Sequence, residues 1–174
     1  MIEQIPEWAL TRADEMQIAD LLTRCFDTDF DNKSYYRQRP HLRLIHRLNG
    51  QIIGHIGLLL RTVRMAGKLT DIAGLAEVCT HPDHRGQQIA SRLLQAAIKL
   101  ADSTPSEYLV LFGKASLYAG HGFIRHPNAL TYLNISSGRT QEIATEPAET
   151  LMVLPLRGQV WTTTAPLDML GPLF

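Results

Sequence analysis

One short segment, residues 78–91, constrains the fold of this chain more than any other part of its sequence. It reads Val-Cys-Thr-His-Pro-Asp-His-Arg-Gly-Gln-Gln-Ile-Ala-Ser. The apolar residues 72–78, interrupted by Glu77, predict a buried strand, and Pro82 and Asp83 predict a loop after it. Apolar residues then repeat at helical spacing, as Ile89, Leu93, Ala97 and Leu100 and again as Ala90, Leu94, Ile98 and Ala101. The segment is therefore predicted to join a strand, through a tight loop, to a long helix over residues 86–101.

The start of this predicted helix has the features of an anion site. The first N–H groups of a helix have no partners inside the helix, and they lie at the positive end of its dipole. Phosphate groups bind at such positions. Arg85 and Arg92 add positive charge, and Gly86 allows a ligand to approach the main chain closely. We expect a pyrophosphate site here; the alternative is a surface strand–turn–helix without a ligand.

Composition narrows the classes of function. With 174 residues, 45% of them hydrophobic, the chain is long enough for one domain with a substantial core. Its 17 basic residues balance 17 acidic ones, so charge gives no argument for nucleic acid or a membrane as partner. The N-terminus lacks the pattern of a signal peptide, and the longest apolar run, residues 52–60, is too short to span a membrane and contains His55. Cys25 and Cys79 form no Cys-x-x-Cys motif, which favours a reducing, cytoplasmic location.

The first half of the chain is predicted to contain a helix and a meander of strands. We expect a first strand around residues 8–10, a helix over 13–26 whose apolar face includes Met16, and a loop over 27–40 with a short second helix. Strands over 41–48, 51–65 and 69–80 follow. Asn49-Gly50 is a strong hairpin turn, and residues 66–68 form the second turn. Gly74 is compatible with a bulge or a close approach of another group.

The second half is predicted to alternate strands and helices. A buried strand over 108–112 should lie parallel to the strand that ends at Thr80, because a helix connects them. A short helix over 114–119, a strand over 131–135, a polar loop over 136–150 and a last strand over 151–156 follow, with Pro155 placing that strand at a sheet edge. This order predicts an α/β domain with a mixed sheet. It lacks the Gly-x-Gly-x-x-Gly and Gly-x-x-x-x-Gly-Lys motifs of dinucleotide folds and P-loops.

The element order and two motifs resemble the GNAT superfamily of acyl-CoA-dependent N-acetyltransferases. The family's phosphate loop reads Gln/Arg-x-x-Gly-x-Gly/Ala, and here residues 85–90 read Arg-Gly-Gln-Gln-Ile-Ala after a His-Pro lead-in. Residues 117–123, Leu-Tyr-Ala-Gly-His-Gly-Phe, are similar to the family's Tyr-x-x-x-Gly-Phe. The resemblance covers about residues 5–135 of a single domain, 1–174. One departure is Gln88 in place of glycine, where we expect a helical main chain and a side chain near the diphosphate.

The resemblance implies a fold, a co-substrate and a set of site residues. The fold is a mostly antiparallel sheet with one parallel, splayed strand pair, flanked by helices. The co-substrate is acetyl-CoA, and transfer to an amine is direct. Main-chain groups that line the pantetheine arm belong to Val78, Cys79 and Thr80. The pyrophosphate cradle comprises Arg85, Gly86, Gln87, Gln88, Ile89, Ala90 and Ser91. Tyr118 is the candidate acid for the departing thiolate, and Glu77 is the candidate base, directly or through water.

Several alternatives stay open. The C-terminal tail is similar to that of nodulation-type N-acyltransferases, which allows longer acyl donors, and a GNAT-like domain can also sense acyl-CoA without catalysis. Cys79 as a nucleophile and His81, Asp83 and His84 as a metal site are weaker hypotheses, and His121 could tune a proton path. The acceptor is not identified, although the family often builds its acceptor pocket where this chain has Asp29, Asp31, Tyr35 and Tyr36. The apolar tail, residues 157–174, is expected to pack on its own sheet or to form a homodimer.

Overall fold

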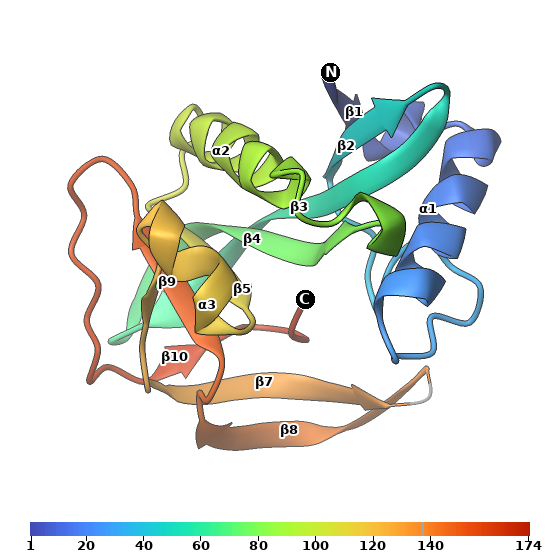
Figure 1. Cartoon of the computed structure of the whole chain (residues 1–174). Coiled ribbons are helices and arrows are strands. Elements are labelled where there is room, and N and C mark those ends of the chain that lie inside the picture. The colour runs from blue at the N-terminus through green and yellow to red at the C-terminus, as the bar shows by residue number, and fades with distance from the viewer. Residues whose placement is uncertain (137) are drawn as a thin grey trace. The chain divides into compact units, whose positions relative to one another are not determined.

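Two long strands, β3 (Gln51–Met65) and β4 (Lys68–Thr80), form a hairpin that runs through the structure (Figure 1). Its turn uses positive φ at both Ala66 (50°) and Gly67 (79°). The turn from β2 (Leu42–Leu48) into β3 has the same geometry, with φ of 49° at Asn49 and 81° at Gly50. Two consecutive left-handed residues match the twist of a hairpin. The predicted three-strand meander and both of its turns are therefore confirmed.

The computed structural model describes residues 1–136 and 138–174. These residues form two compact units, which are described separately. Unit 1 comprises residues 1–59 and 75–100, and unit 2 comprises residues 60–74 and 101–174. Strands β3 and β4 contribute residues to both units, as does helix α2 (Ile89–Asp102).

Unit 1 is a small antiparallel sheet with two helices. Strand β1 (Ile2–Pro6) pairs with β2, and β2 pairs with the first part of β3. Helix α1 (Arg12–Cys25) begins at Thr11, whose hydroxyl accepts a hydrogen bond from the Asp14 N–H at 3.1 Å. A Cβ atom on Gly54 would lie 2.6 Å from Ile89, so glycine there allows α2 to pack closely on β3. One cluster of buried core residues in unit 1 comprises Ile18, Leu21, Leu22, Phe30, Ile45, Ile52 and Cys79.

Four expectations for unit 1 are wrong. Trp8 lies in a 3₁₀ turn, Glu7–Ala9, with 86% of its surface exposed, because β1 has already ended at Pro6. Met16 is also exposed (66%), although α1 itself is confirmed. Residues 27–40 contain no helix, since three of them have positive φ, which interrupts right-handed helical geometry. Helix α2 begins at Ile89 rather than at residue 86 for the same reason, with Gly86 and Gln88 left-handed.

Unit 2 contains the rest of the sheet, in the order β6-β9-β5-β4-β3-β10-β7-β8. Its strands are β5 (Tyr108–Phe112), β6 (Ile124–Arg125), β7 (Ala129–Ser136), β8 (Arg139–Pro147), β9 (Leu151–Pro155) and β10 (Leu167–Asp168). Strand β10 pairs antiparallel with β3 and parallel with β7, so the sheet is mixed, as the sequence predicts. A short helix, α3 (Ala115–Tyr118), follows β5, and a 3₁₀ turn, Ala119–His121, extends it to Gly122.

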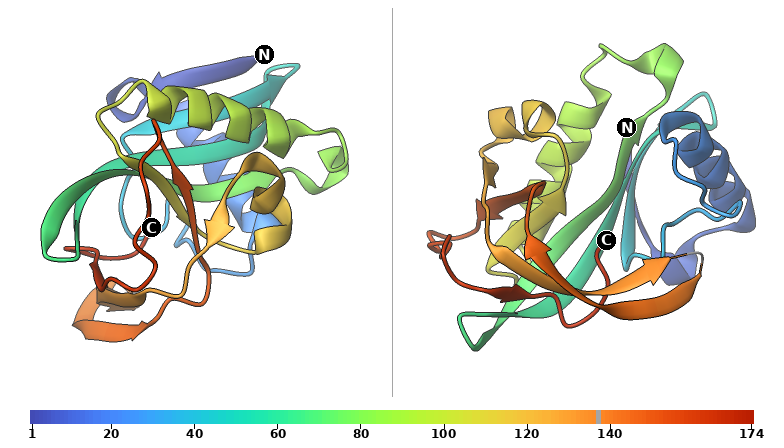
Figure 2. Two further views of the ribbon diagram at one scale, coloured as in Figure 1. Left: turned by 90° about the vertical axis from the view of Figure 1, so that its left-hand side faces the viewer. Right: turned by 90° about the horizontal axis from the view of Figure 1, so that it is seen from below.

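Two expectations for unit 2 are wrong. The predicted polar loop over 136–150 contains strand β8, which pairs with β7 along its length (Figure 2); Ser137 lies outside the described residues. β8 has solvent on both faces, so it shows no apolar alternation. Strand β9 is followed by β10 and lies between β5 and β6 rather than at an edge. Pro155 is tolerated because β6 pairs only with Met152 and Val153.

The C-terminal tail completes the core of unit 2. Trp161, Leu167 and Met169 are buried there, and Leu173 and Phe174 pack against them. The ring of Phe174 lies over Gly74, where a Cβ atom would be 2.6 Å away. Gly74 is thus a site of close approach, one of the two roles predicted for it. The prediction that the tail packs on its own sheet is confirmed.

Candidate active site

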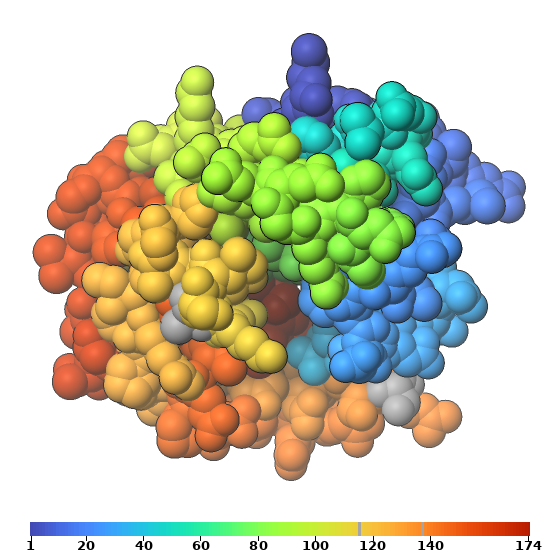
Figure 3. All heavy atoms as spheres, in the orientation of Figure 1, coloured from blue at the N-terminus to red at the C-terminus, as the bar shows by residue number. Residues whose placement is uncertain are grey.

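The loop between β4 and α2 is exposed and turns sharply. A 3₁₀ turn, Pro82–His84, begins after His81, whose ring accepts a hydrogen bond from the Asp83 N–H. Gly86 (φ 77°) and Gln88 (φ 59°) are both left-handed, and residues 85–88 are exposed. The green atoms of this loop lie at the surface in Figure 3. The main chain therefore reverses immediately before the first turn of α2.

This reversal brings an open helix terminus to the surface. The hydrogen bond from the Arg92 N–H to the Gln88 oxygen (3.0 Å) links the first turn of α2 to Gln88. Earlier N–H groups of a helix point out of its end, toward the positive pole of the dipole. A Cβ atom on Gly86 would meet nothing within 4 Å, so the main chain there is accessible. The expectation of a helical main chain at Gln88 is wrong. The backbone there is left-handed, which explains why glycine suits this position.

Strand β4 leads into this loop through three residues, of which Val78 and Thr80 are half-buried and Cys79 is buried. The Cys25 thiol donates a hydrogen bond to the Thr80 carbonyl at 3.3 Å and is hydrogen-bonded to the Cys79 thiol. The bond with Cys79 and the charge of Arg85 lower the pKa of Cys25 to about 7. Cys79 shows the opposite effect, because the bond with Cys25 and burial raise its pKa. The two cysteines, far apart in sequence, thus lie together beside the loop.

Glu77 has a strained backbone and a largely enclosed carboxyl group. Its φ of 47° is left-handed, which costs a non-glycine residue roughly 1–2 kcal/mol. The Tyr36 N–H donates a hydrogen bond to Oε1 at 2.8 Å, while Oε2 is buried and has no partner among the described residues. Burial raises the pKa of Glu77 to about 7, although the Tyr36 bond and the Arg43 charge oppose the rise. A carboxyl group with this pKa can accept a proton at neutral pH.

The main chain of Glu77 is bonded to a buried polar network. His55 and Arg43 are both fully buried; the His55 Nδ1 lies 3.0 Å from the Glu77 carbonyl oxygen, and the Arg43 Nη1 lies 3.1 Å from the His55 Nε2. Arg43 also donates to both carboxyl oxygens of Glu7, at 2.8 and 3.1 Å. Burial alone would raise the pKa of Glu7, but hydrogen bonds from Arg43 and Arg39 outweigh burial and lower it. Burial and the charge of Arg43 lower the pKa of His55 to about 3.

Tyr118 lies in unit 2, whereas Glu77 and the 78–91 segment lie in unit 1. It is the last residue of α3 and is 7% exposed. Its ring packs edge-on against Phe123, with 6.0 Å between centroids. A Cβ atom on Gly113 would lie 2.7 Å from the ring, so glycine at the end of β5 leaves room for it.

The comparison with protein families identifies the family of this chain. A model of the acetyltransferase (GNAT) domain matches residues 9–124, two thirds of the chain. The chain belongs to the GNAT acetyltransferase family. The match includes Glu77, the 78–91 segment and Tyr118. The mixed α/β fold is the one that the resemblance predicts. A comparison with curated protein sequences gives no significant match.

Solved GNAT structures share this fold at low sequence identity. A GNAT family acetyltransferase from Brucella melitensis, solved in complex with acetyl-CoA, has a TM-score of 0.62 and 15% identity over 95% of both chains. YhbS from Escherichia coli, solved with CoA, has a TM-score of 0.66 and 20% identity over 97% of this chain and 88% of its own. The ribosomal-protein-S18-alanine N-acetyltransferase of Escherichia coli has a TM-score of 0.58 and 17% identity over 92% of this chain and 100% of its own.

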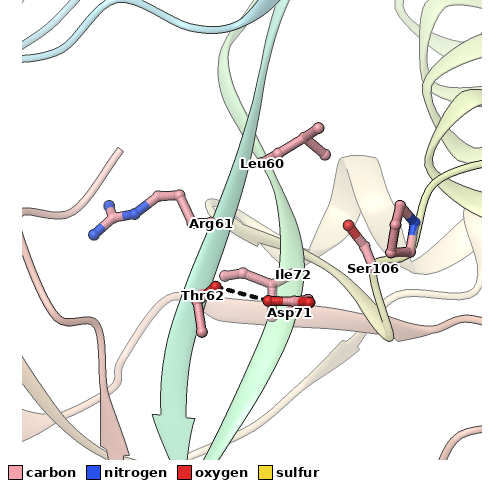
Figure 4. Close-up of a pocket in the computed structure, with 7 residues that line it drawn as sticks. Leu60, Arg61, Thr62, Asp71, Ile72 and Ser106 are labelled. Atoms are coloured by element: carbon pink, nitrogen blue, oxygen red, sulfur yellow. Dashed lines mark hydrogen bonds between the residues drawn. The ribbon is translucent and has the colours of Figure 1, made fainter.

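Unit 2 of this GNAT chain contains a depression of about 240 Å³ that none of the predicted site residues lines (Figure 4). The depression is lined by Leu60, Arg61, Thr62, Asp71, Ile72, Pro105 and Ser106. Thr62 donates a hydrogen bond to Asp71 at 2.7 Å, and Arg61 donates to the Met169 and Pro172 carbonyls. Because these polar groups already bond to the protein, we assign no function to this depression.

Within residues 1–136 and 138–174, no three His, Cys, Asp or Glu side chains form a group that could hold a metal ion. The ring centroids of His81 and His84 lie 5.6 Å apart. No helix in these two ranges is both long enough and apolar enough to cross a membrane.

The loop expected to meet a cationic acceptor, which contains Asp29, Asp31, Tyr35 and Tyr36, has arginines over its aromatic rings. The Arg37 guanidinium lies 4.6 Å from the Tyr36 ring centroid, and that of Arg39 lies 4.7 Å from the Tyr35 centroid. Each guanidinium covers one face of its ring, where a cationic amine would otherwise bind. The acceptor role of this loop stays a prediction.

The sequence patterns did not indicate which residues surround Glu77. Arg43 is a charged residue within a strand, a position typical of a solvent-exposed face, yet it is fully buried. His55 was noted only as a polar residue within an apolar run. That position is itself a signal, because a histidine among buried strand residues needs hydrogen-bond partners. No sequence pattern indicates that the main-chain N–H of Tyr36 binds Glu77.

Proposed function

We propose that this GNAT chain is an N-acetyltransferase that transfers the acetyl group of acetyl-CoA to a primary amine by direct attack. The observation that supports it most is the loop before α2, where left-handed Gly86 and Gln88 leave an accessible main chain at a helix N-terminus. Such a terminus suits a pyrophosphate. The free thiols of Cys25 and Cys79 fit the reducing cytoplasm that we propose as its location.

The residues present fit the proposed co-substrate. The N–H groups at the start of α2 would bind the pyrophosphate, with the exposed Arg85 adding charge. Main-chain groups of Val78, Cys79 and Thr80 would line the pantetheine arm, although the Thr80 carbonyl already accepts the Cys25 thiol. The Thr80 hydroxyl is buried and has no partner among the described residues. These groups supply binding and orientation, and the thioester supplies the acetyl group.

Glu77 and Tyr118 are the proposed proton acceptor and donor. An alkyl amine is protonated at neutral pH, so it must lose a proton before its nitrogen can attack. Oε2 of Glu77 has no partner in the described residues, and a pKa of about 7 allows it to take that proton. As the new C–N bond forms and the C–S bond breaks, the Tyr118 phenol would give a proton to the departing thiolate.

The binding site is tested with a matched pair of variants. Gly86→Glu should abolish acetyl-CoA binding, because the side chain would occupy the loop and repel phosphate. Gly50→Glu is the control, since Gly50 has a similar φ (81°) and open surroundings in the same unit. Calorimetric binding should be lost only in the first variant. Retained binding in Gly86→Glu would show that this loop does not bind the co-substrate.

The reaction is tested by measuring thiol release from acetyl-CoA with a panel of amines. Turnover with an amine supports the proposal, and Tyr118→Phe should then lower kcat with little change in acetyl-CoA affinity. Binding of acetyl-CoA without turnover on any amine would instead indicate a sensor. Turnover restricted to long-chain acyl-CoA would assign a different donor.

A further inference from the structure

We propose that His55, fixed by Arg43, is a positioning residue that holds Glu77 in the geometry needed to accept a proton. The inference rests on the proposed function, in which Glu77 is the base. It concerns five residues that all lie within unit 1: Arg43 in β2, His55 in β3, Glu77 in β4, and Ser34 and Tyr36 in the loop before β2.

The hydrogen bonds of His55 define its protonation state. Arg43 carries only donors, so the His55 Nε2, 3.1 Å from the Arg43 Nη1, must accept. The proton of the neutral ring is then on Nδ1, which donates to the Glu77 carbonyl at 3.0 Å. Both His55 and Arg43 have no exposed surface, so water does not compete for these bonds. His55 is therefore a rigid link between an arginine and the main chain of Glu77.

Arg43 is also linked to the carboxyl group of Glu77, indirectly through the loop before β2. Its Nη1 donates to the Ser34 carbonyl at 2.6 Å, and two residues later the Tyr36 N–H donates to the Glu77 Oε1 at 2.8 Å. One buried guanidinium thus fixes the main chain of Glu77 through His55 and fixes the segment that binds its carboxylate. This double attachment leaves Oε2 as the oxygen without a partner in the described structure.

Glu77 needs such support because its conformation is unfavourable. A non-glycine residue persists in left-handed backbone only when its surroundings determine that conformation. A Cβ atom on Gly57 would lie 2.8 Å from Oε2, so glycine there leaves space beside this oxygen. The charged and titratable groups around Glu77 are Arg43 from β2, Glu7 from the N-terminal turn, His55 from β3 and Cys79 from its own strand.

Two substitutions of His55 separate the two bonds of its ring. In His55→Asn the amide nitrogen replaces Nδ1 and can still donate to the Glu77 carbonyl. In His55→Gln the amide oxygen replaces Nε2 and can still accept from Arg43, but the bond to Glu77 is lost. We expect kcat to fall at least tenfold in His55→Gln and less than threefold in His55→Asn, with an unchanged KM for acetyl-CoA in both. A purely structural role would lower the melting temperature without separating the two kcat values.

Equal kcat values in the two folded variants would overturn the inference. Glu77→Gln is measured in parallel. If Glu77→Gln retains full kcat, the proposed base is wrong. If Glu77→Gln is inactive but the two His55 variants have equal kcat values, only the role of His55 is wrong. NMR of the wild-type protein labelled with ¹⁵N-histidine tests the inference even if a variant fails to fold. The expected result is a neutral His55 with its proton on Nδ1 from pH 5 to 9. A proton on Nε2, or titration in this range, would refute the link.

Discussion

Replacing Gln88 by glycine should raise the free energy of unfolding, although glycine usually destabilises a folded chain. Gln88 is exposed, has a φ of 59° and directly precedes α2. An L-residue with a side chain is strained in this left-handed region because its Cβ atom crowds the carbonyl oxygen that follows. Glycine has no Cβ atom and adopts the same conformation without that cost.

The magnitude follows from two opposing effects. Left-handed backbone costs a residue with a side chain roughly 1–2 kcal/mol. Glycine adds conformational freedom to the unfolded chain, which lowers stability by roughly 0.5–1 kcal/mol. Gln88→Gly should therefore raise the free energy of unfolding by about 0.5–1 kcal/mol. For a chain of this size, each kcal/mol raises Tm by on the order of 2–4 °C.

Gln87→Gly is the matched control. Gln87 is the same residue type, adjacent and also exposed, but its φ is not positive. Glycine there increases the freedom of the unfolded chain without relieving strain, so we expect a loss of roughly 0.5–1 kcal/mol. The two variants should differ by about 1–2 kcal/mol in urea unfolding followed by circular dichroism. The strain argument would be refuted if Gln88→Gly were as destabilising as Gln87→Gly.

Four more predictions test the proposed base and the packing within each unit. Activity as kcat/KM should fall as pH decreases through about 7, because protonated Glu77 cannot accept a proton, and a pH–rate profile of Glu77→Gln should lack this limb. Folding raises the pKa of Glu77, so the wild-type protein should lose stability as pH rises from about 4.5 toward 7, and urea titrations of Glu77→Gln should show a smaller loss. Gly57→Ala should lower kcat and destabilise by roughly 1–3 kcal/mol, since the added Cβ would lie 2.8 Å from the Glu77 Oε2; unchanged kinetics would argue against this packing. Gly74→Ala should destabilise by a similar amount in thermal melts because the ring of Phe174 occupies that space, and the double variant with Phe174→Ala should recover part of the loss if this contact is the cause.

Turns and helices with local signals could be predicted from the sequence. Asn49-Gly50 specifies its turn because both residues tolerate positive φ, and the prediction agrees with the observed angles. Helix α1 has a capping threonine and a repeating apolar face, so its position is confirmed within a residue. The loop motif before α2 likewise predicted the family, because the motif consists of residues that are neighbours in the sequence.

Elements whose stability comes from distant partners could not be predicted in this way. Strand β8 is exposed on both faces, and its main-chain hydrogen bonds exist only because β7 lies beside it. Residues 27–40 form no helix, because contacts to other elements, such as the bond from the Tyr36 N–H to Glu77, determine their conformation.

For the candidate site, the sequence by itself determined the residue types: a glutamate at the end of a buried strand, a glycine loop at a helix start and a tyrosine after the next strand. Only the tertiary structure decided the environment of Glu77. It buried Arg43 against Glu7 and His55, bonded His55 to the Glu77 carbonyl, and brought the Tyr36 N–H to its carboxylate. The physical reason is that burial and hydrogen bonds set a pKa, and these depend on groups that are far apart in sequence and meet only in the folded chain.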